Sequence, residues 1–154
     1  GKLPGLLKSN AADLVLLDYT PQITGVEHLA VGIEKFVVVE SARFEGPEDL
    51  YLVHDPQDTA TEMFFRSQGG KTRAYRRGYM GEVYGITEGV AQGLGRAVMS
   101  EHLVEGDKRL RVVPGLRPQK RSVALCWARQ DWYPKLHLLI REELRDHLAQ
   151  HLSE

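Results

Sequence analysis

Two carboxylates and one histidine are the residues of this sequence best placed to do chemistry. Asp18 and Asp55 each follow a short apolar segment, and His54 directly precedes the second of them. A pair of carboxylates can act as general acid and general base, and a histidine titrates near neutral pH. No nucleophile, oxyanion donor set or metal cluster accompanies them, so we expect no catalysis. His54 is either a ligand contact or a core histidine bonded to a backbone carbonyl.

Three candidate metal ligands lie near the C-terminus. Glu143, His147 and His151 recur every four residues, which puts them on one face of a helix. Zinc can be held by such a set. The same segment carries a leucine-rich stripe, and it lacks the glutamate that follows the first histidine in zinc-protease helices. We therefore expect a solvated helix face and no metal.

Two further motifs raise nucleotide or nucleic-acid binding. Gly93-Leu94-Gly95 resembles part of a dinucleotide fingerprint, but that fingerprint needs a strand before it and a helix after it, and here the order is reversed. Residues 71–79 interleave basic side chains with tyrosines, as binders of single-stranded nucleic acid do. The net charge is only −1, whereas nucleic-acid surfaces are strongly basic. We expect a solvated strand face at 71–79, and no cofactor.

Length and composition bound the fold. With 154 residues, 42% of them hydrophobic and 27% charged, the chain suits one globular domain or two small lobes. Its single cysteine, Cys126, lies in an apolar segment, so we expect a buried thiol and a reducing compartment. No segment approaches the length of a membrane span, no signal peptide is visible, and the first residue is Gly1. These features predict a cytoplasmic protein that is a processed product or a fragment.

Strands and helices are expected to alternate along the chain. Expected helices lie at the N-terminus, after Asp58 or Thr59, around 86–94 and from Tyr133 onward. Thr59 and Glu62 have the spacing of a capping box. Expected strands are 13–17, 27–34, 36–39, 51–54, 72–80, 97–99, 110–113 and 122–128, with 27–34 and 36–39 forming either a hairpin or two successive strands. This order predicts an α/β fold with mainly parallel sheets, whose ligand cleft lies where the strands end.

The segment 85–99 is the most informative one. Ile86, Val90 and Leu94 recur every four residues and therefore share a helix face. Gly93 and Gly95 follow, and glycine tolerates the left-handed conformation that ends many helices. Residues 97–99 are apolar without alternation, as in a strand that is covered on both faces.

This order of helix, Gly-x-Gly, apolar strand and short helical turn resembles the co-inducer-binding domain of LysR-type transcriptional regulators. Four other segments resemble the same family in order and spacing: 6–16, 36–39, 49–54 and 121–152. The resemblance implies a two-lobed fold of the type II periplasmic-binding-protein kind. Subdomain I would comprise 1–40 and 105–154, and subdomain II 41–104. Subdomain I would be incomplete, because the family's first strand and helix are not found before Gly1, and nothing matches the DNA-binding domain.

The resemblance also implies a function. A small-molecule effector would bind between the lobes and control transcription through rearrangement of an oligomer. The positions that would contact it are Asp18, Tyr19, His54, Asp55, Thr59, Thr61, Tyr84, Ile86 and Thr87. A helix start with free amides and a hydroxyl suits an anionic or polar effector. The two acids, Asp18 and Asp55, favour a ligand that bears a cationic group.

Partners follow from the same resemblance. An incomplete first lobe leaves a sheet edge exposed, which favours self-association as a dimer or tetramer. DNA would be bound only through a helix-turn-helix domain that this chain lacks, and no membrane contact is expected. The lobes would hinge near 39–41 and 104–110. The alternatives are a free-standing solute-binding protein, a small α/β enzyme of the same fold, or an interaction fragment that mixes with full-length regulators.

Overall fold

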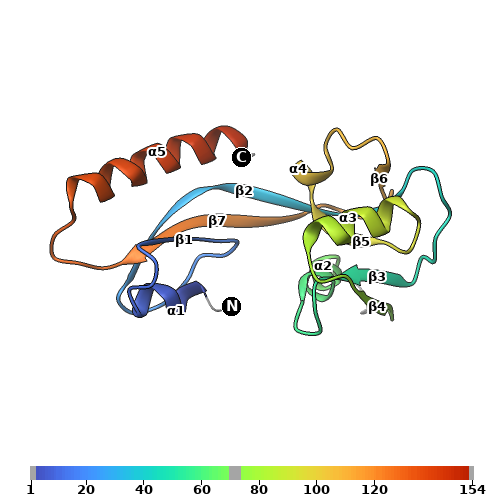
Figure 1. Cartoon of the computed structure of the whole chain (residues 1–154), viewed down its shortest axis with the longest axis horizontal. Helices are drawn as coiled ribbons and strands as arrows, with labels where there is room; N and C mark the ends of the chain where they lie inside the picture. Colours follow the sequence, from blue (N-terminus) through green and yellow to red (C-terminus); the bar gives the residue numbers. More distant parts are fainter. Residues whose placement is uncertain (1–2, 70–73, 153–154) are drawn as a thin grey trace. The chain divides into compact units, whose positions relative to one another are not determined.

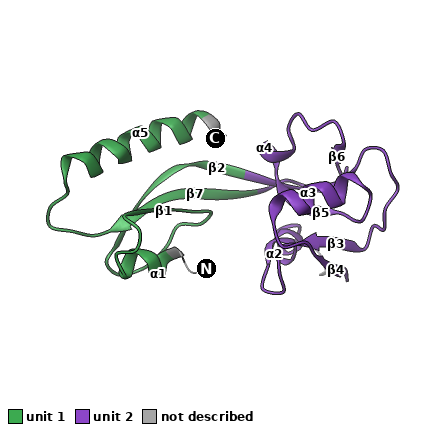
Figure 2. Cartoon of the chain, viewed as in Figure 1, with its two compact units in different colours: residues 1–34, 120–154 green, residues 35–119 purple. Residues whose placement is uncertain are grey.

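The computed structural model describes residues 3–69 and 74–152. The chain forms two compact units (Figures 1 and 2): unit 1 comprises residues 1–34 and 120–154, and unit 2 comprises residues 35–119. Two long strands, β2 (Val26–Ser41) and β7 (Gln119–Ala128), contribute residues to both units. The units are described separately below.

Unit 1 is a sheet covered by one helix on each face (Figure 1). Strand β1 (Leu14–Leu17) pairs antiparallel with β7, and β7 lies between β1 and β2. Successive residues of a strand point to opposite faces, so β7 supplies two cores. Ala124 and Cys126 pack with Leu7 of helix α1 (Leu3–Lys8), while Leu125 and Trp127 pack under helix α5 (Lys135–His151). The prediction of a buried Cys126 is confirmed.

Unit 2 contains the remaining strands and three helices. The second half of β2 pairs antiparallel with β5 (Ala97–Ser100) and with β6 (Leu110–Val112). Strand β3 (Leu50–Val53) pairs parallel with β4 (Arg76–Tyr79). Along the chain, β3 is followed by helix α2 (Ala60–Ser67), β4 by helix α3 (Val83–Ala91) and β5 by helix α4 (Glu101–Val104). The buried faces of β2, β3, α3 and β5 form one apolar core, and aromatic residues of β3 and α2 form another.

The segment 85–99 folds as its sequence predicts, with one exception. Helix α3 buries Ile86 and Val90, Gly93 follows with φ +75°, and the strand β5 begins at Ala97. Leu94, which was expected on the same helix face, lies beyond the helix and is 52% exposed. Gly95 keeps an ordinary φ and is glycine for another reason: a Cβ there would lie 2.6 Å from the carbonyl oxygen of Leu50.

The α/β prediction is confirmed, but the prediction of mainly parallel sheets is wrong. Four strand pairs have a described register: β1–β7, β2–β5 and β2–β6 are antiparallel, and β3–β4 is parallel. The alternation of apolar segments shows which residues form strands. Which strands become neighbours depends on long-range packing that the alternation does not encode. The segments 27–34 and 36–39 are neither a hairpin nor two strands, because both lie in the single strand β2.

The boundaries between the units differ from those expected for the subdomains. Residues 35–40 and 105–119, expected in subdomain I, belong to unit 2. The cause is strand pairing: Val39 faces Val112 across β2 and β6, and Leu110 packs in the same core as Val39. The segments predicted as hinges, 39–41 and 104–110, therefore also lie within unit 2.

Two other expectations concern one helix and one strand. The apolar stripe that was expected along the C-terminal helix is partly buried only toward its end, where Leu144 and Leu148 of α5 and Leu152 after it pack on the sheet, whereas Leu136 is 66% exposed. The predicted strand 72–80 is observed as β4, and residues 70–73 lie outside the described residues. Among the helices that the structure describes, none is long and apolar enough to cross a membrane.

Candidate functional site

The carboxyl ends of three strands in unit 2 form the candidate site, which we call the carboxyl edge. Strands β3 and β4 run parallel, and Tyr51 of β3 forms a parallel bridge with Arg96, just before β5. The three strands therefore end at the same edge, where open α/β folds bind their ligands. His54 follows β3 there, Met80 follows β4, and β5 ends at Ser100.

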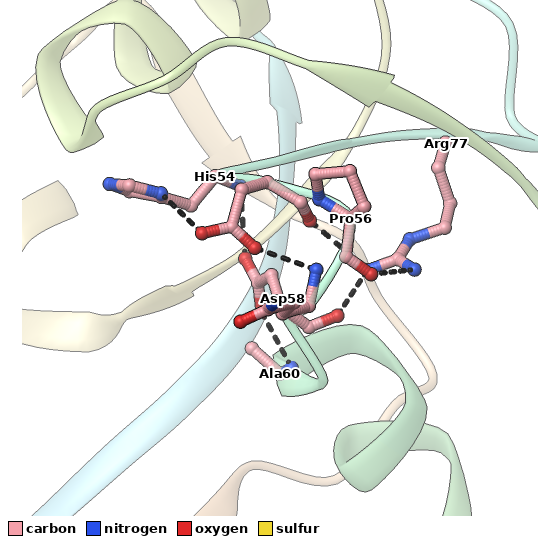
Figure 3. A network of polar contacts seen from close by, with 7 residues as sticks. His54, Pro56, Asp58, Ala60 and Arg77 are labelled. Carbon is pink, nitrogen blue, oxygen red and sulfur yellow. Dashed lines mark hydrogen bonds and ion pairs between the residues drawn. The ribbon is translucent and has the colours of Figure 1, made fainter. Parts of the chain in front are cut away.

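The loop 54–59 after β3 is held by its two aspartates. The carboxylate of Asp58 accepts hydrogen bonds from the backbone amides of His54, at 3.0 Å, and Ala60, at 2.8 Å (Figure 3). Asp58, rather than Thr59, thus satisfies an amide at the start of α2, and the predicted capping box with Glu62 is not formed because Thr59 makes no side-chain cap. The loop backbone is fixed by the carboxylate of Asp58, which leaves the side chains of His54 and Asp55 at the surface.

Arg77 of β4 binds the same loop from the other side. Its guanidinium donates to the backbone carbonyls of Asp55, Pro56 and Asp58. In Figure 3 the guanidinium points into the loop, whereas the imidazole of His54 extends away from it. The buried Nε of Arg77 has no hydrogen-bond partner among the described residues. Sequence reasoning missed this residue, because an arginine that binds backbone carbonyls leaves no motif.

His54 and Asp55 are two of the exposed polar residues of the loop, together with Gln57 and Thr59. The Nδ1 atom of His54 lies 3.3 Å from Oδ2 of Asp55, and about half of each side chain is exposed. The backbone amide of Gln57 donates to the other carboxylate oxygen at 2.6 Å. That amide, together with the imidazole of His54, holds the pKa of Asp55 below its ordinary value. Asp55 is therefore charged at neutral pH and presents a carboxylate to solvent.

Helix α3 begins next to His54. The carbonyl of His54 accepts a hydrogen bond from the amide of Gly81 at 3.0 Å, two residues before α3. Gly81 has φ +81°, a left-handed conformation that suits glycine at this tight turn. The first amides of an α-helix have no acceptor within the helix, so the start of α3 offers hydrogen-bond donors at the carboxyl edge. Tyr84, the second residue of α3, is 80% exposed beside them.

The structure brings some of the predicted contact residues to this edge and buries others. Thr59 is exposed at the start of α2. Thr61 and Ile86 are only 2% and 8% exposed and belong to the interior of unit 2, so neither surface is open to a ligand. Thr87 lies in the second turn of α3, where its hydroxyl donates to the carbonyl of Val83 at 2.9 Å. Thr87 therefore does not mark the helix start, as its sequence position suggested.

Ser100 and His102 are two polar residues at this edge that sequence reasoning did not assign to the site. Ser100 ends β5, and its Oγ lies 2.7 Å from Nδ1 of His102 in α4. The Ser100 residue is 5% exposed, so its hydroxyl is not presented as a nucleophile would be. The rule that selected His54, a polar residue where an apolar strand stops, would also have selected Ser100.

Asp18 and Tyr19 lie in unit 1, after β1. The carboxylate of Asp18 accepts a hydrogen bond from Arg121 of β7 at 2.7 Å, and its side chain is 44% exposed. Tyr19 is 46% exposed. Since Asp18 already has a guanidinium partner, it contributes less to attraction of a cation than an unpaired carboxylate would. Among the described residues, no group of three or more His, Cys, Asp or Glu side chains could hold a metal ion.

Solved structures of LysR-type regulators share this fold. The chain matches full-length LysG from Corynebacterium glutamicum with bound effector Arg (TM-score 0.77, 13% identity), covering 98% of this chain and 56% of LysG. It matches ArgP from Mycobacterium tuberculosis (TM-score 0.82, 15% identity) over 97% of this chain and 55% of ArgP. The effector-binding domain of QuiR in complex with shikimate gives a TM-score of 0.72 at 14% identity, covering 98% of this chain and 78% of that one. The fold is thus the mixed α/β fold of LysR-type effector-binding domains.

The sequence places the chain in the family itself. Residues 1–149 match the LysR substrate binding domain family, and the chain belongs to that family. This confirms the resemblance recognised in the segment 85–99 and its four companion segments. No curated protein sequence matches the chain. The chain spans about half the length of the first two regulators that it matches in structure.

Proposed function

We propose that the chain is the effector-sensing part of a LysR-type transcriptional regulator, and that it binds a small molecule at the carboxyl edge of unit 2. Family membership and fold support a regulator rather than a free-standing solute-binding protein or an enzyme. The observation that carries the site is the loop 54–59, whose backbone is held by Asp58 and Arg77 while His54 and Asp55 face solvent. DNA contact and control of transcription would need a further domain.

The effector class follows from the polar groups at this edge. Asp55 offers a charged carboxylate, and the start of α3 offers amide donors beside the ring of Tyr84. We propose a small polar effector with a cationic group near Asp55 and a hydrogen-bond acceptor near α3. The effector would act as a switch only if it binds one conformation of the regulator more tightly than another.

A thermal-shift screen tests this proposal. The chain is screened against amino acids, aromatic acids, purines and sugar phosphates, because a ligand that binds the folded state raises the melting temperature. We expect a selective hit whose shift is lost in Asp55→Asn and His54→Ala. The shift should persist in Asp131→Asn, which changes an exposed carboxylate of unit 1.

Two outcomes would contradict the proposal. One is the absence of any selective shift at millimolar ligand. The other is a shift that both carboxyl-edge variants retain, which would place the ligand elsewhere. Recovery of the ligand unchanged after long incubation distinguishes sensing from turnover, and a converted ligand would favour the enzyme alternative.

A further inference from the structure

A cavity lies in unit 2 at the opposite ends of the same strands from the carboxyl edge. It has a volume of about 310 Å³ and is lined by the end of β2, the loop 42–49 and the turn 93–96 between α3 and β5. Glu48 precedes β3 and Arg96 precedes β5, so the cavity is at the amino ends of these strands, not at the carboxyl edge. Its size is at the lower end of the range for small-molecule sites, roughly 300–1,000 Å³.

An ion-pair network forms part of the wall of this cavity. The guanidinium of Arg96 donates to one carboxylate oxygen of Glu40, with Nε at 2.9 Å, and Arg111 donates to the other oxygen at 2.9 Å. The side chains of Arg96 and Glu40 are 10% and 19% exposed. Burial raises the pKa of Glu40, but the hydrogen bonds from both arginines outweigh burial and leave that pKa below its ordinary value. Glu40 and Arg96 are thus engaged with each other and hold the wall in place.

The remaining charge of the lining is negative. Three glutamates and two arginines line the cavity. One of the glutamates, Glu40, forms ion pairs with both arginines. Glu45 has no ion-pair or hydrogen-bond partner within the described residues. One carboxylate oxygen of Glu48 lies 3.2 Å from a guanidinium nitrogen of Arg96, and the side chain of Glu48 is 69% exposed. Two glutamates that line the cavity, both in the loop 42–49, therefore keep carboxylate oxygens free to accept hydrogen bonds.

Two uncharged features of the cavity lining, the end of helix α3 and the ring of Phe44, also favour a positively charged ligand. Helix α3 ends at Ala91, beside Ser41 of the lining, whose hydroxyl donates to the Ala91 carbonyl at 2.9 Å. The C-terminus of a helix carries a partial negative charge, which attracts cations. Phe44 also lines the cavity and is 53% exposed, and an aromatic ring attracts a cation placed over its face.

We propose that this cavity binds a small organic cation with an ammonium or guanidinium group. Glu45 and Glu48 accept its hydrogen bonds, the ring of Phe44 contacts it, and the Arg96–Glu40 pair forms the wall. The site is distinct from the carboxyl edge, and helix α3 runs from one to the other. The chain would therefore carry a second ligand site, independent of the effector site proposed above.

NMR mapping tests this site. The ¹⁵N-labelled chain is titrated with 1,4-diaminobutane and with methylguanidinium, and butane-1,4-diol and succinate serve as neutral and anionic analogues. We expect saturable amide shifts at 44–48 and 93–96 with the cations alone. The double variant Glu45→Gln, Glu48→Gln should weaken binding by about tenfold or more, since it removes two charged acceptors. The variant Glu105→Gln, an exposed carboxylate outside the lining, should bind as the parent does.

The site is overturned if neither cation shifts these amides at millimolar concentration, or if the diol or succinate binds as well as the amine. Shifts confined to 54–60 and 81–87 would place the cation at the carboxyl edge and would equally refute the second site. Unchanged binding by the double variant, with its melting temperature preserved, would also refute it. The substituted residues lie in an exposed loop, so folding is not expected to depend on them.

Discussion

At the scale of one residue, Arg77 belongs to a basic segment but stabilises the fold by binding backbone carbonyls of its own chain. The segment 71–79 has the composition of a nucleic-acid-binding strand, but its two arginines in β4 bind their own chain. Arg76 donates to both carboxylate oxygens of Asp49, and Arg77 donates to carbonyls of the loop after β3. A charged donor to a backbone carbonyl is stronger than a neutral one, so Arg77 fixes the loop that presents His54 and Asp55.

We predict that Arg77→Ala destabilises unit 2 and weakens effector binding together. Loss of the guanidinium leaves carbonyls of the loop without their donor, at a cost of about 2 kcal/mol. Urea denaturation measures the stability, and the thermal-shift assay measures binding. Arg76→Ala is the matched control, because its ion pair with Asp49 is on the surface and is expected to change stability little. Equal effects of the two substitutions would show that the loop does not depend on Arg77.

At the scale of elements, the sequence predicted the strands and helices better than their pairing. Apolar runs and glycines located α3, β5, β1 and β3, because local patterning reflects burial directly. The direction of neighbouring strands was wrong, since it depends on contacts far apart in the sequence, such as Val39 with Val112. The end of a strand singled out His54, which the sequence left as either a ligand contact or a core histidine, and the structure places its side chain at the surface, about half exposed. Thr61 and Ile86 were predicted as effector contacts because each lies near the start of a helix. Both are buried, because each lies on the face of its helix that packs against the rest of unit 2.

The turn between α3 and β5 gives a prediction about backbone packing. A Cβ at Gly95 would lie 2.6 Å from the carbonyl oxygen of Leu50, and a backbone atom held in a strand cannot move aside cheaply. We expect Gly95→Ala to lower the free energy of unfolding by about 2 kcal/mol. Gly5→Ala, in α1, is the control: no atom lies within 4 Å of the added Cβ, and alanine favours a helix by about 0.5–1 kcal/mol. Opposite signs in urea denaturation are therefore expected, and a neutral Gly95→Ala would contradict the close approach.

At the scale of the whole molecule, apolar surface on unit 1 points to association between chains. Strand β1 is an outer strand of its sheet, and its Leu16 is 41% exposed. Helix α5 exposes Leu136, at 66%, and Leu139, at 55%, on one face. Contiguous exposed apolar surface is unusual on a soluble monomer and commonly marks an interface. The sequence predicted self-association from the sheet edge alone, and the first half of α5 adds a second surface.

We predict that the chain self-associates reversibly in the micromolar range, as a dimer or tetramer, and that α5 contributes to the interface. Sedimentation velocity or light scattering over a concentration series should show mass above that of the monomer. The double variant Leu136→Lys, Leu139→Lys should shift the equilibrium toward monomer, because each substitution puts a charge where apolar area would be buried. Leu103→Lys, on an exposed leucine of unit 2, should leave it unchanged. A parent chain that stays monomeric throughout would refute self-association, whereas association that survives the α5 double variant would assign the interface to the edge of β1 instead.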